Sequence, residues 1–202
     1  MKNPILLAID TSGAKLQLAL LINDEIDVYI EDIARGHAEI IFDRIKILLA
    51  KNNITYSQLT RIAVTIGPGS FTGLRVGISA ARSLALALNI EVVGISNLLV
   101  LSLGKTIKDF AIMIDARRGE AYVQEFKGAN EPAGVVRVQN FEQAKAQLEA
   151  AETRIFTDPV IDIKLMAKFT LNLKAKNYLP LPCYIRKADA KVQTKGLIEI
   201  RV

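Results

Sequence analysis

The stretch Gly67-Pro68-Gly69-Ser70-Phe71-Thr72-Gly73-Leu74-Arg75-Val76-Gly77 lies between an apolar, strand-like segment and a long apolar helix pattern. A glycine-rich turn before a helix is typical of phosphate binding, because free backbone N–H groups and the helix dipole attract anions. A Walker loop would end in Gly-Lys-Ser/Thr, whereas this stretch ends in Gly73-Leu74-Arg75, and a dinucleotide fingerprint would need glycine at Thr72. The remaining feature is a four-residue spacing of glycines on one side of a helix: Gly69, Gly73 and Gly77. We therefore interpret the stretch as a packing surface.

Composition places the chain among globular proteins. Of its 202 residues, 50% are hydrophobic and 23% are charged. No uninterrupted apolar run reaches the length of a membrane helix, and the apolar stretch before Asp10 is too short for a signal peptide. Cys183 is the single cysteine, so no internal disulfide can form, which fits a reducing cytosol. We expect a cytoplasmic protein with no membrane partner.

The single histidine limits the chemistry that the chain can perform. With one His and one Cys, neither a paired-histidine metal site nor a cysteine cluster can be built, so we expect no metal site. A Ser-His-Asp triad could use only His37, which stands at an expected helix start, where a structural role is commoner. The net charge of +5 would suit a nucleic-acid neighbourhood, but the basic residues are scattered, which favours a solvated surface.

Periodicity predicts two halves with the same order of elements. In the first half we expect strands at 5–10, 15–21, 25–33, 61–66 and 91–95, and helices at 37–51, 71–89 and 96–104. In the second half we expect strands at 110–115, 121–126, 134–138 and 154–157, and helices at 140–150 and 161–173. Both halves therefore read β-β-β-α-β-α, which indicates an internal duplication in an α/β protein. We predict two lobes, 1–105 and 106–202, each with a mixed sheet covered by helices.

Each half begins with an apolar strand that ends in Ile-Asp. Asp10 leads into a turn with Thr11 and Ser12, and Asp115 leads into a turn with Arg117 and Arg118. Two interpretations stay open. The two turns could face each other across a cleft and hold phosphate and magnesium, or each aspartate could order its own hairpin through hydrogen bonds to the backbone.

Two helices of the first half carry more apolar surface than one sheet requires. On a helical wheel the helix at 71–89 has one small-residue side and, beside it, a second apolar stripe containing Leu74 and Ile78. In the helix at 37–51, Ile40 and Ile47 lie outside the main stripe. Burial within one domain would explain this excess, but a partner protein explains it better. The predicted partner interface consists of Ile40, Ile47, Gly69, Phe71, Gly73, Gly77, Ala80, Leu84 and Ala87.

Several motifs together resemble the bacterial TsaB (YeaZ) family. They are Ile9-Asp10-Thr11-Ser12, Arg35-Gly36-His37, the stretch 67–77, Asp115-Ala116-Arg117-Arg118-Gly119-Glu120-Ala121-Tyr122 and Pro182-Cys183-Tyr184-Ile185-Arg186. The resemblance implies an actin-like (ASKHA, ribonuclease H-like) fold of two duplicated lobes. It also implies a non-catalytic scaffold that binds the catalytic subunit TsaD, with the ATPase TsaE joining, in the synthesis of tRNA N6-threonylcarbamoyladenosine.

The same resemblance places the partner surface on the helices at 37–51 and 71–89, and implies that the chain alone forms homodimers through these faces. It implies no catalytic residue in this chain and tRNA only as substrate of the complex. Because the second lobe shows no glycine-rich adenosine-binding turn, we expect no cofactor bound by this chain alone; a nucleotide would sit at the partner interface.

Two other functions compete with the scaffold hypothesis. One is an actin-like ATPase or phosphotransferase that uses Asp10 and Asp115 with Mg²⁺, which would need a preformed phosphate clamp and an adenosine pocket. The other is direct tRNA binding through scattered basic residues, which would weaken steeply with salt. These basic residues are Arg117, Arg118, Arg186, Lys187, Lys191 and Lys195.

Overall fold

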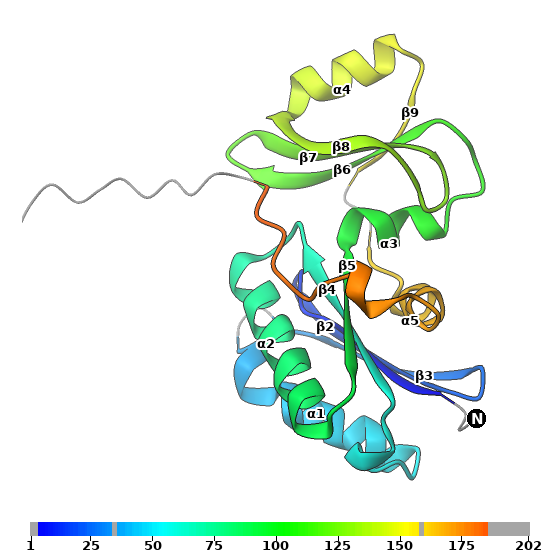
Figure 1. Cartoon of the computed structure of the whole chain (residues 1–202). Helices are drawn as coiled ribbons and strands as arrows, with labels where there is room; N and C mark the ends of the chain where they lie inside the picture. Colours follow the sequence, from blue (N-terminus) through cyan, green and yellow to red (C-terminus); the bar gives the residue numbers. More distant parts are fainter. Residues whose placement is uncertain (1–3, 34–35, 158–159, 186–202) are drawn as a thin grey trace, which may run out of the picture.

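Two mixed sheets with flanking helices form two lobes in the computed structural model, which describes residues 4–33, 36–157 and 160–185 (Figure 1). The first lobe contains β1 (Ile5–Asp10), β2 (Lys15–Ile22), β3 (Glu25–Asp32), α1 (His37–Lys51), the 3-10 turn η1 (Tyr56–Gln58), β4 (Arg61–Gly67), α2 (Phe71–Leu88), β5 (Glu91–Ser96) and α3 (Asn97–Leu103). There follow β6 (Phe110–Arg117), β7 (Glu120–Gly128), β8 (Glu131–Asn140), α4 (Phe141–Ala150), β9 (Arg154–Thr157), α5 (Ile163–Thr170) and the 3-10 turn η2 (Ala175–Asn177).

The two sheets repeat one topology. Strand order is β3-β2-β1-β4-β5 in the first sheet and β8-β7-β6-β9 in the second. In both, the first three strands are antiparallel neighbours, and the fourth strand of the repeat pairs in parallel with the first. The predicted duplication and the α/β class are therefore confirmed. The element bounds agree with the prediction to within a few residues, and β1 matches at both ends.

Alternating side chains of the central strands fill two cores. Leu7 and Ile9 of β1 join Leu18 and Leu20 of β2 in the core under α1 and α2. Leu6 and Ala8 face the opposite side of the sheet, where they meet α3 and α5. Because successive residues of a strand point to opposite faces, a strand buried on both sides reads as a continuous apolar run. α1 and α2 lie together on one face of the sheet and α5 lies on the other (Figure 1).

The core between the lobes is shared. α5 follows the last strand of the second sheet, yet it packs against β1 and β2 of the first sheet. Its Met166 and Ala167 belong to the same buried cluster as Phe110 and Phe126 of the second sheet. The sheets fall on either side of the proposed division at residues 105 and 106. The division into two domains at this point stays a prediction, since α5, which follows the second sheet in the chain, completes the core of the first sheet.

A C-terminal strap, residues 178–185, crosses the first lobe near the ends of β4 and β5 (Figure 1). The backbone N–H of Gly94 donates to the carbonyl of Tyr178 at 2.8 Å, and that of Cys183 donates to the carbonyl of Ile66 at 2.8 Å. A Cβ on residue 94 would lie 2.5 Å from the carbonyl oxygen of Leu179, so only glycine lets the strap approach so closely. The strap thereby reaches the N-terminal end of α2.

One helix of the described residues, α2, has the length and mean hydropathy of a membrane span, although the sequence prediction excluded one. Eight of its residues are buried against β1, β4, β5 and α1, and it carries two arginines. These features are typical of a core helix in a globular domain.

Candidate functional site

The glycine-rich stretch packs onto the turn that follows β1. The hydroxyl of Thr11 donates to the carbonyl of Gly73 at 2.7 Å, and the backbone N–H of Ser70 donates to the carbonyl of Ser12 at 2.7 Å. Cβ atoms on Gly73 and Gly77 would overlap the carbonyl oxygen and the hydroxyl of Thr11, respectively. The predicted packing role is therefore present, but the neighbour is this chain's own turn.

This contact corrects the predicted orientation of α2. Gly73, Gly77, Ala80 and Leu84 are buried within the first lobe, and both apolar stripes of the wheel belong to the same buried face. Ile40, Ile47, Gly69, Phe71 and Ala87 of the predicted interface remain partly or fully exposed. The wheel identified the apolar residues correctly, but a wheel does not show which side faces the sheet.

Asp10 is enclosed by hydrogen-bond donors of its own lobe. Its Oδ1 accepts from the backbone N–H of Ser12 at 3.0 Å, from the Ser12 hydroxyl at 2.6 Å and from the Thr65 hydroxyl at 2.7 Å. Its Oδ2 accepts from Nε2 of Gln17 at 3.1 Å. The carboxylate is 2% exposed. These contacts favour the structural interpretation of Asp10, because a buried carboxylate with four donors is satisfied without a ligand.

The network extends toward the glycine-rich stretch through Asn97, the first residue of α3. Asn97 Nδ2 donates to the Ser12 hydroxyl at 2.6 Å, and its Oδ1 accepts from the backbone N–H of Gly67 at 3.0 Å. The sequence reasoning did not single out Gln17, Thr65 or Asn97. Polar residues inside otherwise apolar strands were the signal available for Gln17 and Thr65.

Asp115 and Arg117 lie apart from this network. A hollow of about 290 Å³ between the lobes is lined by Asp10, Ser12 and Gln17 on one side and by the apolar Ile114, Val160 and Ile161 on the other. Asp115 does not line it, so the two aspartates do not face each other there. The exposed Asp115 instead accepts from its own Arg117 backbone N–H at 2.7 Å. The remaining candidate basic residues, Arg186, Lys187, Lys191 and Lys195, lie outside the described residues.

A groove of about 430 Å³ runs between α1 and α2 on the outer face of the first lobe. Its lining is mostly apolar and includes Phe42, Phe71 and Val76, together with Arg75. Phe42 is 46% exposed and Phe71 is 55% exposed. On the same two helices, Ile47 is 48% exposed and Leu86 is 85% exposed. Exposed aromatic and aliphatic side chains around a groove are typical of protein–protein contacts.

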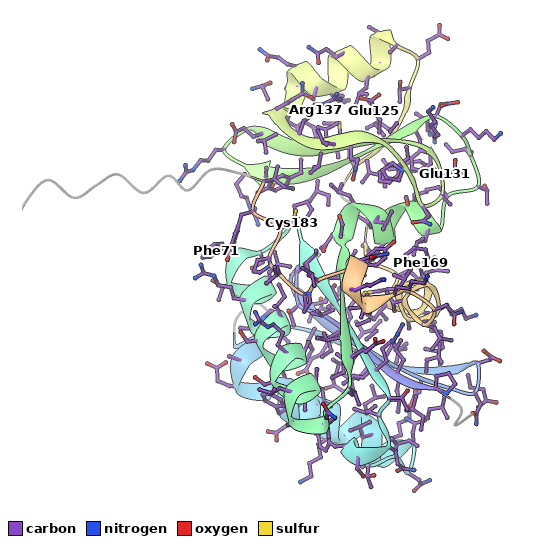
Figure 2. The ribbon with its side chains drawn as sticks, in the orientation of Figure 1. Phe71, Glu125, Glu131, Arg137, Phe169 and Cys183 are labelled. Atoms are coloured by element: carbon purple, nitrogen blue, oxygen red, sulfur yellow. The ribbon has the colours of Figure 1, made fainter. Side chains whose placement is uncertain are left out.

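Arg75 contacts two aromatic residues at the end of this groove. Its guanidinium carbon lies 3.8 Å from the centroid of the Phe71 ring and 6.0 Å from that of Tyr184, in the C-terminal strap. Its Nε donates to the Tyr184 hydroxyl at 3.2 Å. Phe71, at the start of α2, and Cys183, in the strap, lie at the same end of the helix (Figure 2). The strap therefore shapes one end of the groove.

Charge pairs attach α1 to the edge strand β3. Arg44 of α1 donates to Glu31 through Nε at 2.6 Å and through Nη2 at 3.2 Å, and the Tyr29 hydroxyl donates to the same carboxylate at 2.5 Å. The hydrogen bonds from Arg44 and Tyr29 lower the pKa of Glu31 to about 2. Lys51 and Asn52 similarly lower the pKa of Asp27. These pairs fix the helix that forms one wall of the groove.

His37 lies at the start of α1, as the sequence predicted. Its Nε2 is buried and has no hydrogen-bond partner among the described residues. It lines a hollow with Gly13, Gly36 and Ser70. No cluster of three or more metal-ligating side chains occurs in the described parts of the chain. Burial raises the pKa of the half-exposed Cys183 thiol, which disfavours a reactive thiolate.

Comparison with known proteins relates this geometry to a family. The TsaD family, described as tRNA N6-adenosine threonylcarbamoyltransferase, matches residues 28–148, which is more than half of the chain. The chain belongs to the TsaD family. TsaB of Escherichia coli K12 is 32% identical over 126 residues, which cover 60% of this chain and 54% of that protein. TsaB of Bacillus subtilis 168 is 34% identical over 128 residues, covering 62% and 56%.

The structural comparison covers more of the chain. YeaZ from Pseudomonas aeruginosa superposes with a TM-score of 0.72 at 26% identity, over 90% of this chain and 99% of that one. The expected TsaB (YeaZ) relationship and the actin-like fold within the TsaD family are therefore confirmed. The chain spans about half the length of the curated TsaB relatives that it matches.

Proposed function

We propose that this chain is a non-catalytic subunit of the assembly that makes N6-threonylcarbamoyladenosine in tRNA, and that it binds the catalytic subunit TsaD through the α1–α2 groove. The observation that carries the proposal is the exposed apolar groove, with Phe42 on one helix and Phe71 on the other. TsaE joins this assembly, and two copies of the chain pair through the same groove when TsaD is absent. A cytosolic location belongs to the same proposal.

The proposal that the chain is non-catalytic rests on the side chains that it contains and on their hydrogen bonds. The chain has one histidine, so a paired-histidine metal site is beyond its composition. Asp10, the first acidic candidate for a phosphotransferase, already accepts four hydrogen bonds within its lobe. The lobe opposite it presents apolar residues to the hollow. Nothing in this arrangement favours the ATPase alternative.

Binding of purified full-length chain to TsaD of the same organism tests the proposal. Calorimetry and sedimentation should detect a complex, and Phe42→Glu should reduce its affinity at least about tenfold, because a charge in an apolar contact is costly to desolvate. Val135→Glu is the matched control, since Val135 is 80% exposed on β8 of the other lobe. Ala80→Glu is less informative, because Ala80 is 4% exposed and a charge there would unfold the core.

Two results would overturn the proposal. One is undiminished TsaD affinity of Phe42→Glu with an unchanged melting temperature. The other is transfer of a threonylcarbamoyl group to tRNA by this chain without TsaD. Tight Mg-ATP binding by the isolated chain would restore the ATPase alternative.

A further inference from the structure

We propose that Arg75 is a specificity-determining residue of the groove and that it receives a carboxylate from a helix of the catalytic partner. This inference rests on the proposed function and adds the chemistry of the partner: a helix that presents an Asp or Glu next to apolar side chains. The proposed occupant of the groove is a helix of TsaD.

The side chain of Arg75 is already ordered before any partner binds. The stacking on Phe71 and the hydrogen bond from Nε to the Tyr184 hydroxyl fix the guanidinium plane. Ordering a free arginine on binding costs rotamer entropy, and a fixed guanidinium avoids much of that cost. Because Nε is used by Tyr184, the edge formed by Nη1 and Nη2 remains available for the paired hydrogen bonds that a carboxylate accepts.

Arg75 has no acidic partner among the described residues. It forms none of the ion pairs found there, and its only charged companion on α2 is Arg82. Neither acidic residue of neighbouring α1, Glu39 or Asp43, forms an ion pair with Arg75 in the described structure. Arg75 therefore has no ion-pair partner within the described chain.

The surroundings of Arg75 make the pair more favourable than an ordinary surface ion pair. Arg75 lines the groove together with Phe42, Phe71 and Val76. A helix laid in the groove would remove this region from water, and charge pairs at interfaces strengthen when water is excluded. The groove thus fits a helix whose apolar side chains meet the phenylalanines while a carboxylate meets Arg75.

Charge also disfavours a second copy whose α2 faces this α2. The charged residues of α2 are both arginines, so two α2 helices facing each other would bring like charges together. A TsaD helix with an acidic residue would instead pair with Arg75. Tyr184 acts as a positioning residue, because it orients Arg75 from the strap without lying on the groove wall.

The test measures the affinity and the salt dependence of TsaD binding for full-length variants. Arg75→Gln should weaken TsaD binding about tenfold or more and make the affinity less dependent on salt. The affinity of Arg75→Lys should lie between those of the wild type and Arg75→Gln, because lysine keeps the charge but lacks the planar guanidinium. Tyr184→Phe should weaken binding a few-fold. Arg82→Gln is the matched control, since Arg82 lies on the same helix but lines a different hollow. Arg75→Glu should regain binding when one acidic residue on the TsaD contact helix is changed to arginine.

The outcomes separate this inference from the proposed function. If Phe42→Glu abolishes binding while Arg75→Gln binds TsaD with unchanged affinity and salt dependence, the groove proposal stands and the Arg75 inference is wrong. If Arg75→Gln loses only self-association, the occupant is a second copy and the commitment to TsaD is wrong. If the wild-type chain does not bind TsaD, both proposals fail.

Discussion

Thr11 contacts α2 directly at Gly73. Its hydroxyl donates to the Gly73 carbonyl at 2.7 Å, and its own carbonyl oxygen occupies the space that a side chain on residue 73 would need. The β1–β2 turn and the N-terminal end of α2 are therefore one packed unit, although 62 positions separate the two residues. This contact orients α2 so that Phe71 and Arg75 remain on the outside.

Replacing Gly73 with alanine should destabilise the protein. In an exposed helix, alanine is about 1 kcal/mol more favourable than glycine. Here the added methyl group would overlap the Thr11 carbonyl oxygen, which is backbone and cannot rotate away. Overpacking of this kind costs typically about 1–3 kcal/mol. Because the overlapped atom is backbone, we expect the upper end of this range, and subtracting the helix gain leaves a net loss of about 2 kcal/mol in the free energy of unfolding, measured by urea denaturation.

Gly13→Ala is the control for this change. Nothing lies within 4 Å of where its Cβ would be, so stability should change by less than about 0.5 kcal/mol. A Gly73→Ala protein as stable as the wild type would contradict the proposed close approach.

Asp10→Asn should also destabilise the chain. An asparagine keeps the shape but places an amide donor against groups that are donors themselves, and it removes the negative charge that four donors share. An unsatisfied buried polar group costs about 1–3 kcal/mol, which thermal or chemical denaturation would resolve. The exposed Asp115→Asn should change stability by less than about 0.5 kcal/mol. Equal effects at both positions would contradict the different roles assigned to them.

The topology could be predicted from the sequence because its signals are local. The apolar run at Ile5–Asp10 and the alternation at Glu25–Asp32 mark strands without reference to the rest of the chain. The order of elements then revealed the duplication. α5 was predicted too long, because Asp162 caps its start and Arg61, about a hundred residues earlier, binds its last carbonyls. That second contact is invisible in the local sequence.

The candidate site was harder to predict for the same reason. The wheel of α2 showed an apolar excess, but the choice of buried side depends on Thr11, which is remote in sequence. Phe42 lies outside the main apolar stripe of α1, and Arg75 is one of two charged residues on α2. Both features are visible in the sequence, but each is only a weak indication of a binding residue. The stacking of Arg75 with Tyr184 joins positions 109 residues apart, so no pattern within one helix could indicate it.

The bond between α1 and β3 should weaken at low pH. The pKa of Glu31 is about 2, below its ordinary value of 4.5, because Arg44 and Tyr29 hydrogen-bond to the charged carboxylate. A carboxyl group whose pKa is lowered by folding stabilises the folded state at pH values above its ordinary pKa. This stabilisation is lost as the pH falls from 4.5 toward 2. Arg44→Met should raise the pKa of Glu31 toward its ordinary value, which an NMR titration of the Glu31 carboxyl would follow.

Lys46→Met is the control, because Lys46 is exposed on the same helix and forms no ion pair found in the described residues. The stability difference between wild type and Arg44→Met should shrink as the pH falls through this range. A constant difference would show that Arg44 acts through packing alone.

Arg61 should hold α5 against the first sheet. Its Nη1 donates to the carbonyls of Thr170, Leu171 and Leu173 at 3.1, 2.8 and 2.7 Å, and its Nη2 pairs with Glu91. Thr170 is the last residue of α5, Leu171 is its C-cap and Leu173 follows two residues later, so Arg61 lies at the helix C-terminus, where a cation also interacts favourably with the helix dipole. Arg61→Met should lower the free energy of unfolding by about 2–4 kcal/mol, because several charge-assisted hydrogen bonds are lost together.

The duplication supplies a matched control for Arg61. Arg154 is the first residue of β9, as Arg61 is the first residue of β4. Strand β4 pairs with β1, and β9 pairs with the equivalent strand β6. Arg154 is exposed and binds no helix end within the described residues. Hydrogen exchange should therefore quicken at the amides of 163–173 in Arg61→Met and stay unchanged in Arg154→Met. Unchanged exchange in both variants would mean that apolar packing of Met166 and Ala167, without Arg61, is sufficient to hold α5 between the lobes.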